Sequence, residues 1–292
     1  MPAVIERLYL DAPSLTYRAF FALPRSIADA AGRPVNAVRG VMEMITRLLT
    51  DRRPAEVVAV FDDDYRPAFR VASYQGYKAD RPADPPELPP QFEVLAEVLD
   101  AAGIRRVISP GLEADDALAA LTTEVPPGEV AAVVTGDRDL FALVRDPKVV
   151  VLFTVRGVSE LAVFDEGAVE AAHGVPPRLY PEYAILRGDP SDGLPGVAGI
   201  GPKRAAALLG AHGSIEGIYA HLDELPARQR AAFDQARAYI EAMRVVVPMT
   251  ADAALESTAR GEPDEAALQA LAERYNLGSS AVRLARALRG AR

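Results

Sequence analysis

The first half of the chain alternates short apolar runs with segments of helical periodicity. The apolar runs predict strands at residues 4–10, 56–61, 104–108 and 130–134. Apolar positions at helical spacing predict helices at residues 14–21, 35–49, 92–102 and 113–123. Two more runs, 149–153 and 161–164, predict a hairpin around Arg156 and Gly157, and from about residue 166 the pattern is helical almost to the end. Strands that alternate with helices are typical of a parallel α/β sheet.

The composition limits the number of domains, the kind of metal site and the compartment that this protein can have. The chain has 292 residues, half of them hydrophobic, which suffices for one large domain or two small ones. Cysteine is absent, so a disulfide or a thiolate metal site is excluded and a reducing compartment is allowed. The N-terminus carries Glu6 and Asp11 and has no signal-peptide run, and no segment is long and apolar enough for a membrane span. We therefore expect a cytoplasmic protein with no membrane contact.

Acids follow the apolar runs at Asp11, Asp62 and Asp137. The carboxyl ends of parallel strands share one edge of a sheet, where ligands bind, so these acids should meet. Further acids that could join them are Glu113, Asp115, Asp116, Asp139, Asp189 and Asp192. So many carboxylates cannot share a site while ionised unless cations hold them. Oxygen ligands select Mg²⁺ or Mn²⁺, and two such ions about 3.5–4 Å apart would suit phosphoryl transfer.

Each acid also has a simpler interpretation. A lone Asp after a strand is often a helix cap, and Glu113 with the acids after it could be a capped, solvated helix start. Asp63 and Asp64 fit a solvated turn. The histidines at positions 173, 212 and 221 lie outside the pattern and are expected to be surface or packing residues. Only the joint pattern of acids predicts a metal site.

The stretch 187–209 combines two acids with a glycine-rich turn. Asp189 and Asp192 are three residues apart and could face one point. Gly199 and Gly201 allow a close backbone approach, and the N–H groups after Pro202 are free at a helix start. A phosphate fits such a place, and Lys203 adds a charge. The alternative is an ordinary turn between two helices.

Basic residues gather locally although the net charge is −9, which argues against a general nucleic-acid coat. Segment 65–90 mixes prolines with cations and rings, namely Arg66, Arg70, Lys78, Arg81, Tyr65, Phe69, Tyr74 and Tyr77. Cations can follow phosphates and rings can stack on bases, as a single-stranded 5′ end requires. Lys78 and Arg81 would share a face if this segment were helical. The alternative is a solvated loop.

With these motifs in order, the sequence resembles the bacterial 5′ nucleases, which are the stand-alone flap endonucleases and the 5′-nuclease domain of DNA polymerase I. The resemblance covers nearly the whole chain. It rests on LYLDAPSLTYRAFFALP, VAVFD, YQGYKADRP, LEADDALAAL, VVTGDRDLFALV and LRGDPSDGLPGVAGIGPKRAA. It implies a PIN-like α/β core over 1–175 with an arch at about 65–90. A helical part should follow over 176–292, with a helix–three-turn–helix module at about 183–220.

The resemblance also implies roles for individual residues. The first metal would be held by Asp11, Asp62, Glu113 and Asp115, with Asp116 near it. The second would be held by Asp137, Asp139 and Asp192, with Asp189 supporting it. The basic gateway of the family matches Tyr77, Lys78 and Arg81, with Arg18 on the first helix. Duplex contacts match Gly199, Gly201, Lys203 and Arg204, and the family's K⁺ site matches the carbonyls of Val197 and Ile200.

Two features depart from the family pattern. Gly193 stands where most relatives have Asn, and Ala12-Pro13 replaces the usual Gly-Ser. Neither removes an acid, so both concern local geometry and through it the rate or the metal preference.

These observations predict a monomeric, nucleoid-associated nuclease that cuts DNA at 5′ flaps, nicks and single-strand/duplex junctions, by two-metal hydrolysis and without reading sequence. The resemblance implies that it acts in replication and repair. One alternative is a PIN-like ribonuclease, against which the phosphate-binding hairpin argues. Another is a non-catalytic DNA-binding scaffold, against which the acids argue, because a mere binder gains nothing from carboxylates beside phosphate.

Overall fold

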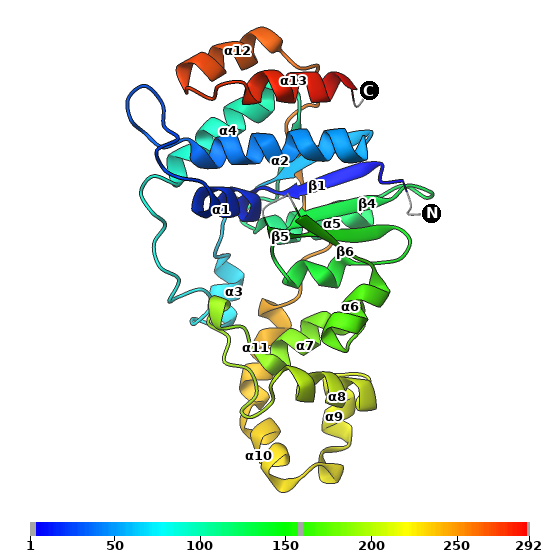
Figure 1. The fold of residues 1–292 in the computed structure, drawn as a ribbon. Helices are drawn as coiled ribbons and strands as arrows, with labels where there is room; N and C mark the ends of the chain where they lie inside the picture. The colour runs from blue at the N-terminus through cyan, green and yellow to red at the C-terminus, as the bar shows by residue number, and fades with distance from the viewer. Residues whose placement is uncertain (1–3, 157–159, 291–292) are drawn as a thin grey trace.

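The fold is seen in a computed structural model that describes residues 4–156 and 160–290. Within these residues a seven-stranded sheet has the order β6-β5-β4-β1-β2-β3-β7 (Figure 1). Its strands are β1 (Arg7–Asp11), β2 (Glu56–Val60), β3 (Arg105–Ile108), β4 (Ala131–Thr135), β5 (Val149–Arg156), β6 (Glu160–Phe164) and β7 (Glu256–Ser257). The strands from β5 to β3 are parallel, and β6 and β7 are antiparallel edges. The predicted, mostly parallel α/β sheet is confirmed.

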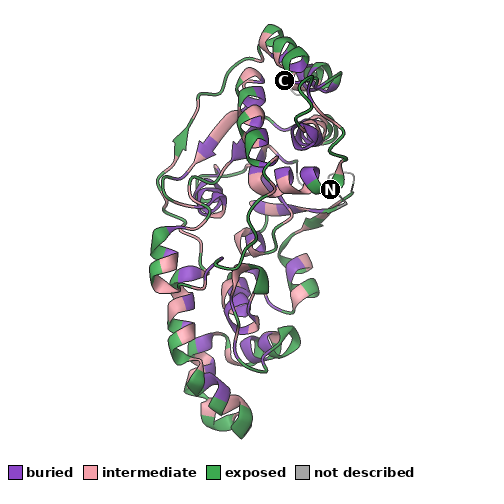
Figure 2. Cartoon of the chain, turned by 90° about the vertical axis from the view of Figure 1, so that its left-hand side faces the viewer, coloured by how far each residue is buried: buried purple, intermediate pink, exposed green. Residues whose placement is uncertain are grey.

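Helices cover both faces of the sheet, because successive side chains of a strand point to opposite sides. Leu8 and Leu10 pack into one apolar cluster, while Tyr9 packs into the other. The first face carries α1 (Ala12–Ala22), α2 (Asn36–Arg52), α4 (Pro89–Ala101), α12 (Glu265–Arg274) and α13 (Ser280–Gly290). The second face carries α5 (Ala114–Thr123), α6 (Glu166–His173) and α7 (Tyr180–Arg187). Figure 2 shows the buried strands between these layers.

A smaller group of helices extends from the second face and forms the narrow end of the molecule (Figure 1). It consists of α8 (Pro202–His212), α9 (Ile215–Ala220), α10 (Ala227–Gln235) and α11 (Arg237–Val246). The short helix α3 (Ala68–Ser73) contacts α11 and lies between this group and the sheet. We call α8–α11 the helical module.

After the helical module the chain returns to the sheet. β7 pairs with β3, and Leu268 of α12, Leu277 of the following turn and Leu284 of α13 are buried in the same apolar cluster as α2 and α4. The C-terminal helices therefore belong to the layer that covers the α/β core. The predicted division of the chain near residue 175 stays a prediction.

The predicted elements differ from the observed ones mainly at their ends. The first strand begins at Arg7 rather than at residue 4, and the first helix begins at Ala12, directly after the capping residue Asp11. The β5–β6 hairpin is present, but Gly157 of its turn lies outside the described residues. The two-residue strand β7 was not predicted, since two residues carry no periodicity. No helix in the described ranges is long and apolar enough to cross a membrane.

Candidate active site

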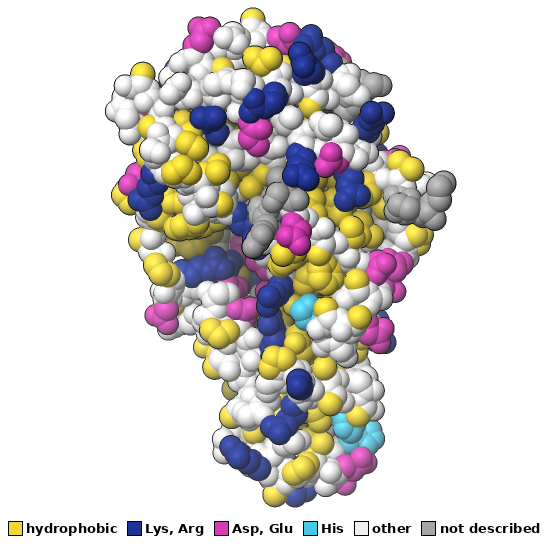
Figure 3. Space-filling view, viewed as in Figure 1, with side chains coloured by type: hydrophobic (Ala, Val, Ile, Leu, Met, Phe, Trp, Pro, Cys, Tyr) yellow, Lys and Arg dark blue, Asp and Glu magenta, His cyan; other side chains and the backbone are white. Residues whose placement is uncertain are grey.

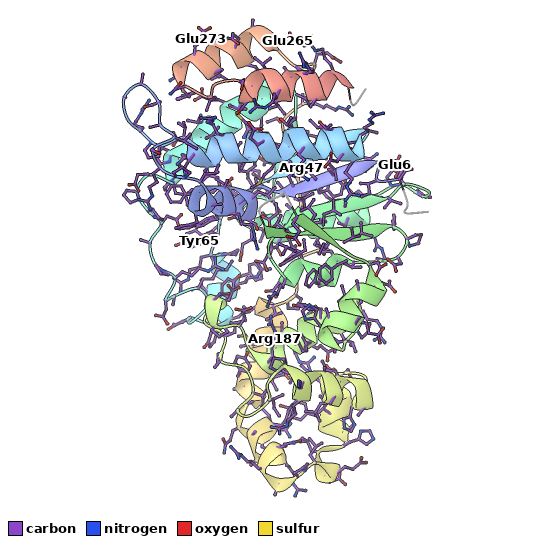
Figure 4. The ribbon with its side chains drawn as sticks, in the orientation of Figure 1. Glu6, Arg47, Tyr65, Arg187, Glu265 and Glu273 are labelled. Carbon is purple, nitrogen blue, oxygen red and sulfur yellow. The ribbon has the colours of Figure 1, made fainter. Side chains whose placement is uncertain are left out.

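A cleft of about 1910 Å³ opens at the carboxyl edge of the sheet. The predicted acids that line it are Asp11, Asp62, Glu113, Asp115, Asp137 and Asp189. The cations that line it are Arg18, Lys78, Arg81, Arg138 and Arg187. Figure 3 shows this hollow with basic and acidic side chains at its edge, and in Figure 4 the lining residues Tyr65 and Arg187 lie on two sides of it. Both charge signs therefore meet in one cleft.

The topology of the sheet brings the acids together. β1 lies beside β4, and the chain leaves β1 toward β2 on one side but leaves β4 toward β5 on the other, so a crevice forms at the carboxyl ends of these two strands. Asp11 ends β1, and its Oδ2 accepts a hydrogen bond of 2.6 Å from the hydroxyl of Thr135, which ends β4. That hydroxyl also accepts the N–H of Asp137 at 2.8 Å. Thr135 thus links Asp11 to Asp137. The sequence analysis did not single out Thr135, because it appears in the sequence only as a polar residue at the end of an apolar strand.

The start of α5 lies at the same edge. Glu113 is its N-cap, and Asp62 reaches across from the end of β2 to accept the N–H of Ala114 at 2.7 Å. The capping role offered as the alternative for Asp62 is therefore real, and Asp62 lines the cleft as well. Asp115, in the first turn of the helix, also lines it.

The remaining acids lie on the opposite side of the crevice. Asp137 accepts the N–H of Asp139 at 2.9 Å, and Asp139 Oδ1 lies 3.8 Å from Arg187 Nη2. Arg187 also donates to Asp189 at 3.4 Å, while Asp192 pairs with Arg81 at 2.6 Å. Asp139 and Asp192 are not among the residues that line the cleft, and each has an arginine counter-ion, Arg187 for Asp139 and Arg81 for Asp192, which the sequence pattern did not predict.

Burial and mutual repulsion shift the pKa values of these acids upward. Burial raises the pKa of Asp11 to about 7, with the charges of Asp137 and Asp62 adding to it against hydrogen bonds from Thr135 and Ser14. Burial, followed by the charge of Asp137, raises the pKa of Asp139 to about 8. The surrounding protein likewise raises the pKa values of Asp115, which is half-buried, and of Asp137, whose side chain is open to the solvent of the cleft. Asp62 is open to the solvent of the cleft, yet the protein crowded around it still raises its pKa.

The basic gateway lies over the acids, although not as a helix. Residues 75–80 form turns, so Lys78 and Arg81 do not share a helical face and bind different acids. Lys78 pairs with Glu113, and its backbone N–H donates to the carbonyl of Asp192 at 2.9 Å. Its φ of 50° is unusual for a residue with a side chain, and this backbone hydrogen bond helps to hold it. Arg18 lines the cleft from α1 and donates to the carbonyl of Gly136 at 3.3 Å.

The expected roles of Tyr77 and Arg70 in DNA contact need correction. The Tyr77 ring is buried, and its hydroxyl donates to Glu113 Oε1 at 2.6 Å, so it cannot stack on a base in this arrangement. Arg70 is also buried, and its guanidinium is used by Glu113 and Asp116. Tyr65 and Phe69 are the large exposed rings of this segment within the described residues.

Asp116 does not face the cleft, contrary to the expectation that it works beside the first metal. Asp116 is fully buried. Its carboxylate accepts hydrogen bonds from Nη1 and Nη2 of Arg70 and from the backbone N–H of Thr250, the last at 2.7 Å. It also caps the N–H of Glu113, three residues earlier. Helical spacing put Glu113 and Asp116 on one face, and both contact Arg70, but only Glu113 also lines the cleft.

The glycine hairpin has the geometry of an exposed turn before a helix. Gly199 has a φ of 75°, Gly201 is the N-cap of α8, and a Cβ on either glycine would contact nothing. The side chains of Val197 and Ile200 are buried and anchor the turn, and Arg204 donates to the carbonyl of Gly199. Lys203 is exposed. The backbone is therefore free to approach an external group, and the K⁺ site on the carbonyls of Val197 and Ile200 stays a prediction.

Comparison with known proteins identifies two family regions. Residues 6–174 match the family described as 5'-3' exonuclease, N-terminal resolvase-like domain, and residues 175–267 match 5'-3' exonuclease, C-terminal SAM fold. A Streptomyces coelicolor protein named 5'-3' exonuclease is 44% identical over 297 residues, covering 95% of this chain and 98% of the relative. DNA polymerase I of Mycobacterium bovis is 40% identical over 264 residues, which are 90% of this chain and 28% of the polymerase.

Solved structures agree on the fold. A bacteriophage T5 flap endonuclease, described as a pseudo-enzyme-product complex with DNA and metal ions, matches with a TM-score of 0.66 at 18% identity and covers 98% of each chain. The resemblance noted from the sequence is thereby confirmed. With both family regions matched in order along nearly its whole length, the chain belongs to the 5'-3' exonuclease family.

Proposed function

We propose that this nuclease hydrolyses DNA phosphodiester bonds at 5′ flaps and 5′ ends, without reading base sequence, in replication and repair. One observation carries the proposal: carboxylates from three strand ends and from the start of α5 face Lys78, Arg81 and Arg18 across one cleft. A basic groove alone would bind DNA without cutting it, and an acid cluster alone would repel phosphate. A phosphodiesterase site needs both.

The donor set of the cleft fits a hard cation. The acids offer only oxygen, the ligand of Mg²⁺ and Mn²⁺, and crowding raises the pKa values of Asp11, Asp115 and Asp137, which a bound cation would relieve. In the described residues no three acidic or histidine side chains already stand in a metal-holding arrangement, so the fit rests on the chemistry of the donors.

We assign the two groups of acids to two ions. Asp11, Asp62, Glu113 and Asp115 would hold the first, and Asp137, Asp139 and Asp192 the second, with Asp189 supporting it. When bound, such ions lower the pKa of a coordinated water and stabilise charge on the attacking and leaving oxygens. Arg81 and Lys78 would orient the scissile phosphate and neutralise its developing charge. Their present partners, Asp192 and Glu113, hold both cations beside the acids until phosphate arrives.

The helical module would hold the duplex behind the cut. At the start of α8 the N–H groups of Arg204 and Ala205 donate to the Gly201 carbonyl at 3.0 and 2.9 Å, which leaves the N–H of Lys203 for a phosphate of the DNA backbone. The side chains of Lys203 and Arg204 add charge, and a Cβ on Gly199 or Gly201 would contact nothing, so there is room for the phosphate. The carbonyls of Val197 and Ile200 would hold a K⁺ ion, which would supply positive charge at the turn. These contacts read the backbone and not the bases, so cleavage should depend on DNA structure. We expect a monomer that acts on nucleoid DNA in the cytoplasm.

The test is cleavage of one labelled DNA flap, one blunt duplex and one RNA flap of the same sequence, with and without Mg²⁺ or Mn²⁺. The proposal expects metal-dependent cleavage of both DNA substrates and little cleavage of RNA. Preferential cleavage of RNA would support the ribonuclease alternative. Binding of the DNA flap without cleavage at any metal concentration would support a non-catalytic scaffold.

A further inference from the structure

Arg70 is buried where three parts of the fold meet. Its side chain is 3% exposed, although Arg is among the residues least often found inside proteins. Nη1 donates to Glu113 Oε1 at 3.0 Å and to Asp116 Oδ2 at 2.8 Å, and Nη2 donates to Asp116 Oδ1 at 2.7 Å. Nε donates to the carbonyl of Val246 at 3.0 Å, and Nη2 also contacts that of Pro248 at 3.3 Å. All its nitrogens are therefore used.

These contacts join the cleft to the helical module. Arg70 belongs to α3, at the base of the segment that carries Lys78 and Arg81. Glu113 lines the cleft at the start of α5. Val246 and Pro248 lie where the chain leaves the last helix of the module, and the N–H of Thr250 closes the same network on Asp116. Figure 1 shows α3 against α11, between the sheet and the module.

The geometry of this network is specific to a guanidinium. A planar fork can meet both oxygens of Asp116, a Glu113 oxygen and two backbone carbonyls at once. A lysine could keep the charge, but its ammonium is a single point and cannot satisfy the same five acceptors. A buried network of this kind defines a relative position more than it adds net stability.

We propose that Arg70 is a positioning residue that sets which phosphodiester bond is cut. This inference rests on the proposed function. The helical module would hold the duplex and the acids would carry the chemistry, so the cut bond depends on the distance between the two. Arg70 and Asp116 fix that distance by binding the start of α5 and the end of α11 to the same group. Loosening the network lets neighbouring bonds reach the acids.

The experiment maps product lengths from one end-labelled flap with a fixed junction, under single-turnover conditions. The variants are Arg70→Lys, which keeps the charge, and Asp116→Asn, which keeps the shape and weakens the pair. Wild type should give one dominant product. In both variants the fraction cut at adjacent bonds should rise by about threefold or more. Because either variant could also lose stability, melting temperatures are measured and cleavage is assayed well below them.

Leu284→Ala is the matched control. Leu284 lies on α13 and is fully buried in the apolar cluster of α2, on the face of the sheet opposite to α5 and α11, so its truncation lowers stability without touching Arg70. It should keep the wild-type cut position. If Arg70→Lys and Asp116→Asn also keep that position and lose only stability, the inference is wrong and Arg70 is an ordinary structural residue. A wild-type chain that cuts no flap would instead refute the proposed function itself.

Discussion

Gly193 packs directly against the backbone of Gly76. A Cβ on Gly193 would overlap the carbonyl oxygen of Gly76, and the φ of Gly193 is 73°. The same two segments are joined by the hydrogen bond from Lys78 N–H to the Asp192 carbonyl. The turn at residues 75–80 is therefore in backbone contact with the turn at residues 189–193. Gly193, which departs from the family pattern, permits this contact because it has no side chain.

Gly193→Asn should consequently slow cleavage. Asn tolerates a positive φ, but its Cβ would push the 75–80 turn away and displace Lys78 and Arg81 from the acids. We expect a single-turnover rate about tenfold lower with little change in duplex affinity. Gly128→Asn is the control, because Gly128 also has positive φ and a Cβ there would contact nothing. Equal rates in wild type and Gly193→Asn would show that the turn can adapt.

Lys78→Ala and Arg81→Ala should reduce the chemical step more than binding. Their proposed interaction with the scissile phosphate strengthens as charge develops, so each should lower the single-turnover rate by about 10²-fold. Lys203→Ala provides the contrast, since an exposed charge on α8 should affect affinity alone. A proportional loss of affinity with an unchanged rate would make both residues simple phosphate contacts.

Asp115→Asn and Asp137→Asn should nearly abolish cleavage and leave DNA binding largely intact. Each removes one oxygen ligand from a different group of acids, while the phosphate contacts elsewhere remain. Asp64→Asn is the comparison, because the Asp64 carboxylate accepts the N–H of Arg66 in a turn and is not among the residues that line the cleft. A wild-type rate in either variant at saturating metal would remove that residue from the proposed metal site.

The sequence predicted which acids meet, but not which way each one faces. Asp11, Asp62 and Asp137 could be placed because strand ends share an edge whatever the rest of the fold does. Tyr77 and Asp116 could not, since the orientation of Tyr77 depends on Glu113 and that of Asp116 on Arg70 and Thr250, all of them distant in sequence from the residue they orient. The same applies to Arg187, whose role follows from the position of Asp139. Periodicity assigns a face to a helix, and only the packing shows what that face meets.

The raised pKa values of the acids predict an unusual pH dependence of stability without metal. A carboxyl whose pKa is higher in the folded state than in the unfolded chain stabilises the fold at low pH, and this contribution is lost as pH rises. For Asp11 and Asp139 the loss extends from about pH 4 to their folded pKa values of about 7 and about 8. The metal-free protein should therefore melt several degrees lower at pH 8 than the Asp139→Asn variant.

Melting curves at pH 5 and pH 8, with EDTA or with Mg²⁺, test this prediction. At pH 5 the two proteins should differ less, because Asp139 is then mostly protonated. Mg²⁺ should raise the melting temperature of the wild type at pH 8 more than that of the variant, because metal binds the folded state and needs the carboxylate. A variant that is less stable than wild type at pH 8 in EDTA would contradict the raised pKa of Asp139.

The glycine hairpin allows DNA binding to be separated from folding. Gly201 has a φ of −85°, and no atom lies near a Cβ built on it, so Gly201→Val should fold normally. Gly199 is less suitable, because its φ of 75° would cost a side chain about 1–2 kcal/mol. If the N–H of Lys203 at the start of α8 holds duplex phosphate, the valine will push that phosphate away. Binding should weaken for substrates with a long duplex arm and change much less for a minimal substrate.

The measurement is affinity and cleavage rate against duplex-arm length. Gly210→Val is the control, since Gly210 is exposed on the same helix and a Cβ there also meets nothing, yet it lies two turns beyond the helix start. Lys203→Ala should lower affinity modestly and reduce the salt slope by about one unit. If folded Gly201→Val lost activity equally at every arm length, the hairpin would support the Asp189–Asp192 turn and would not hold DNA.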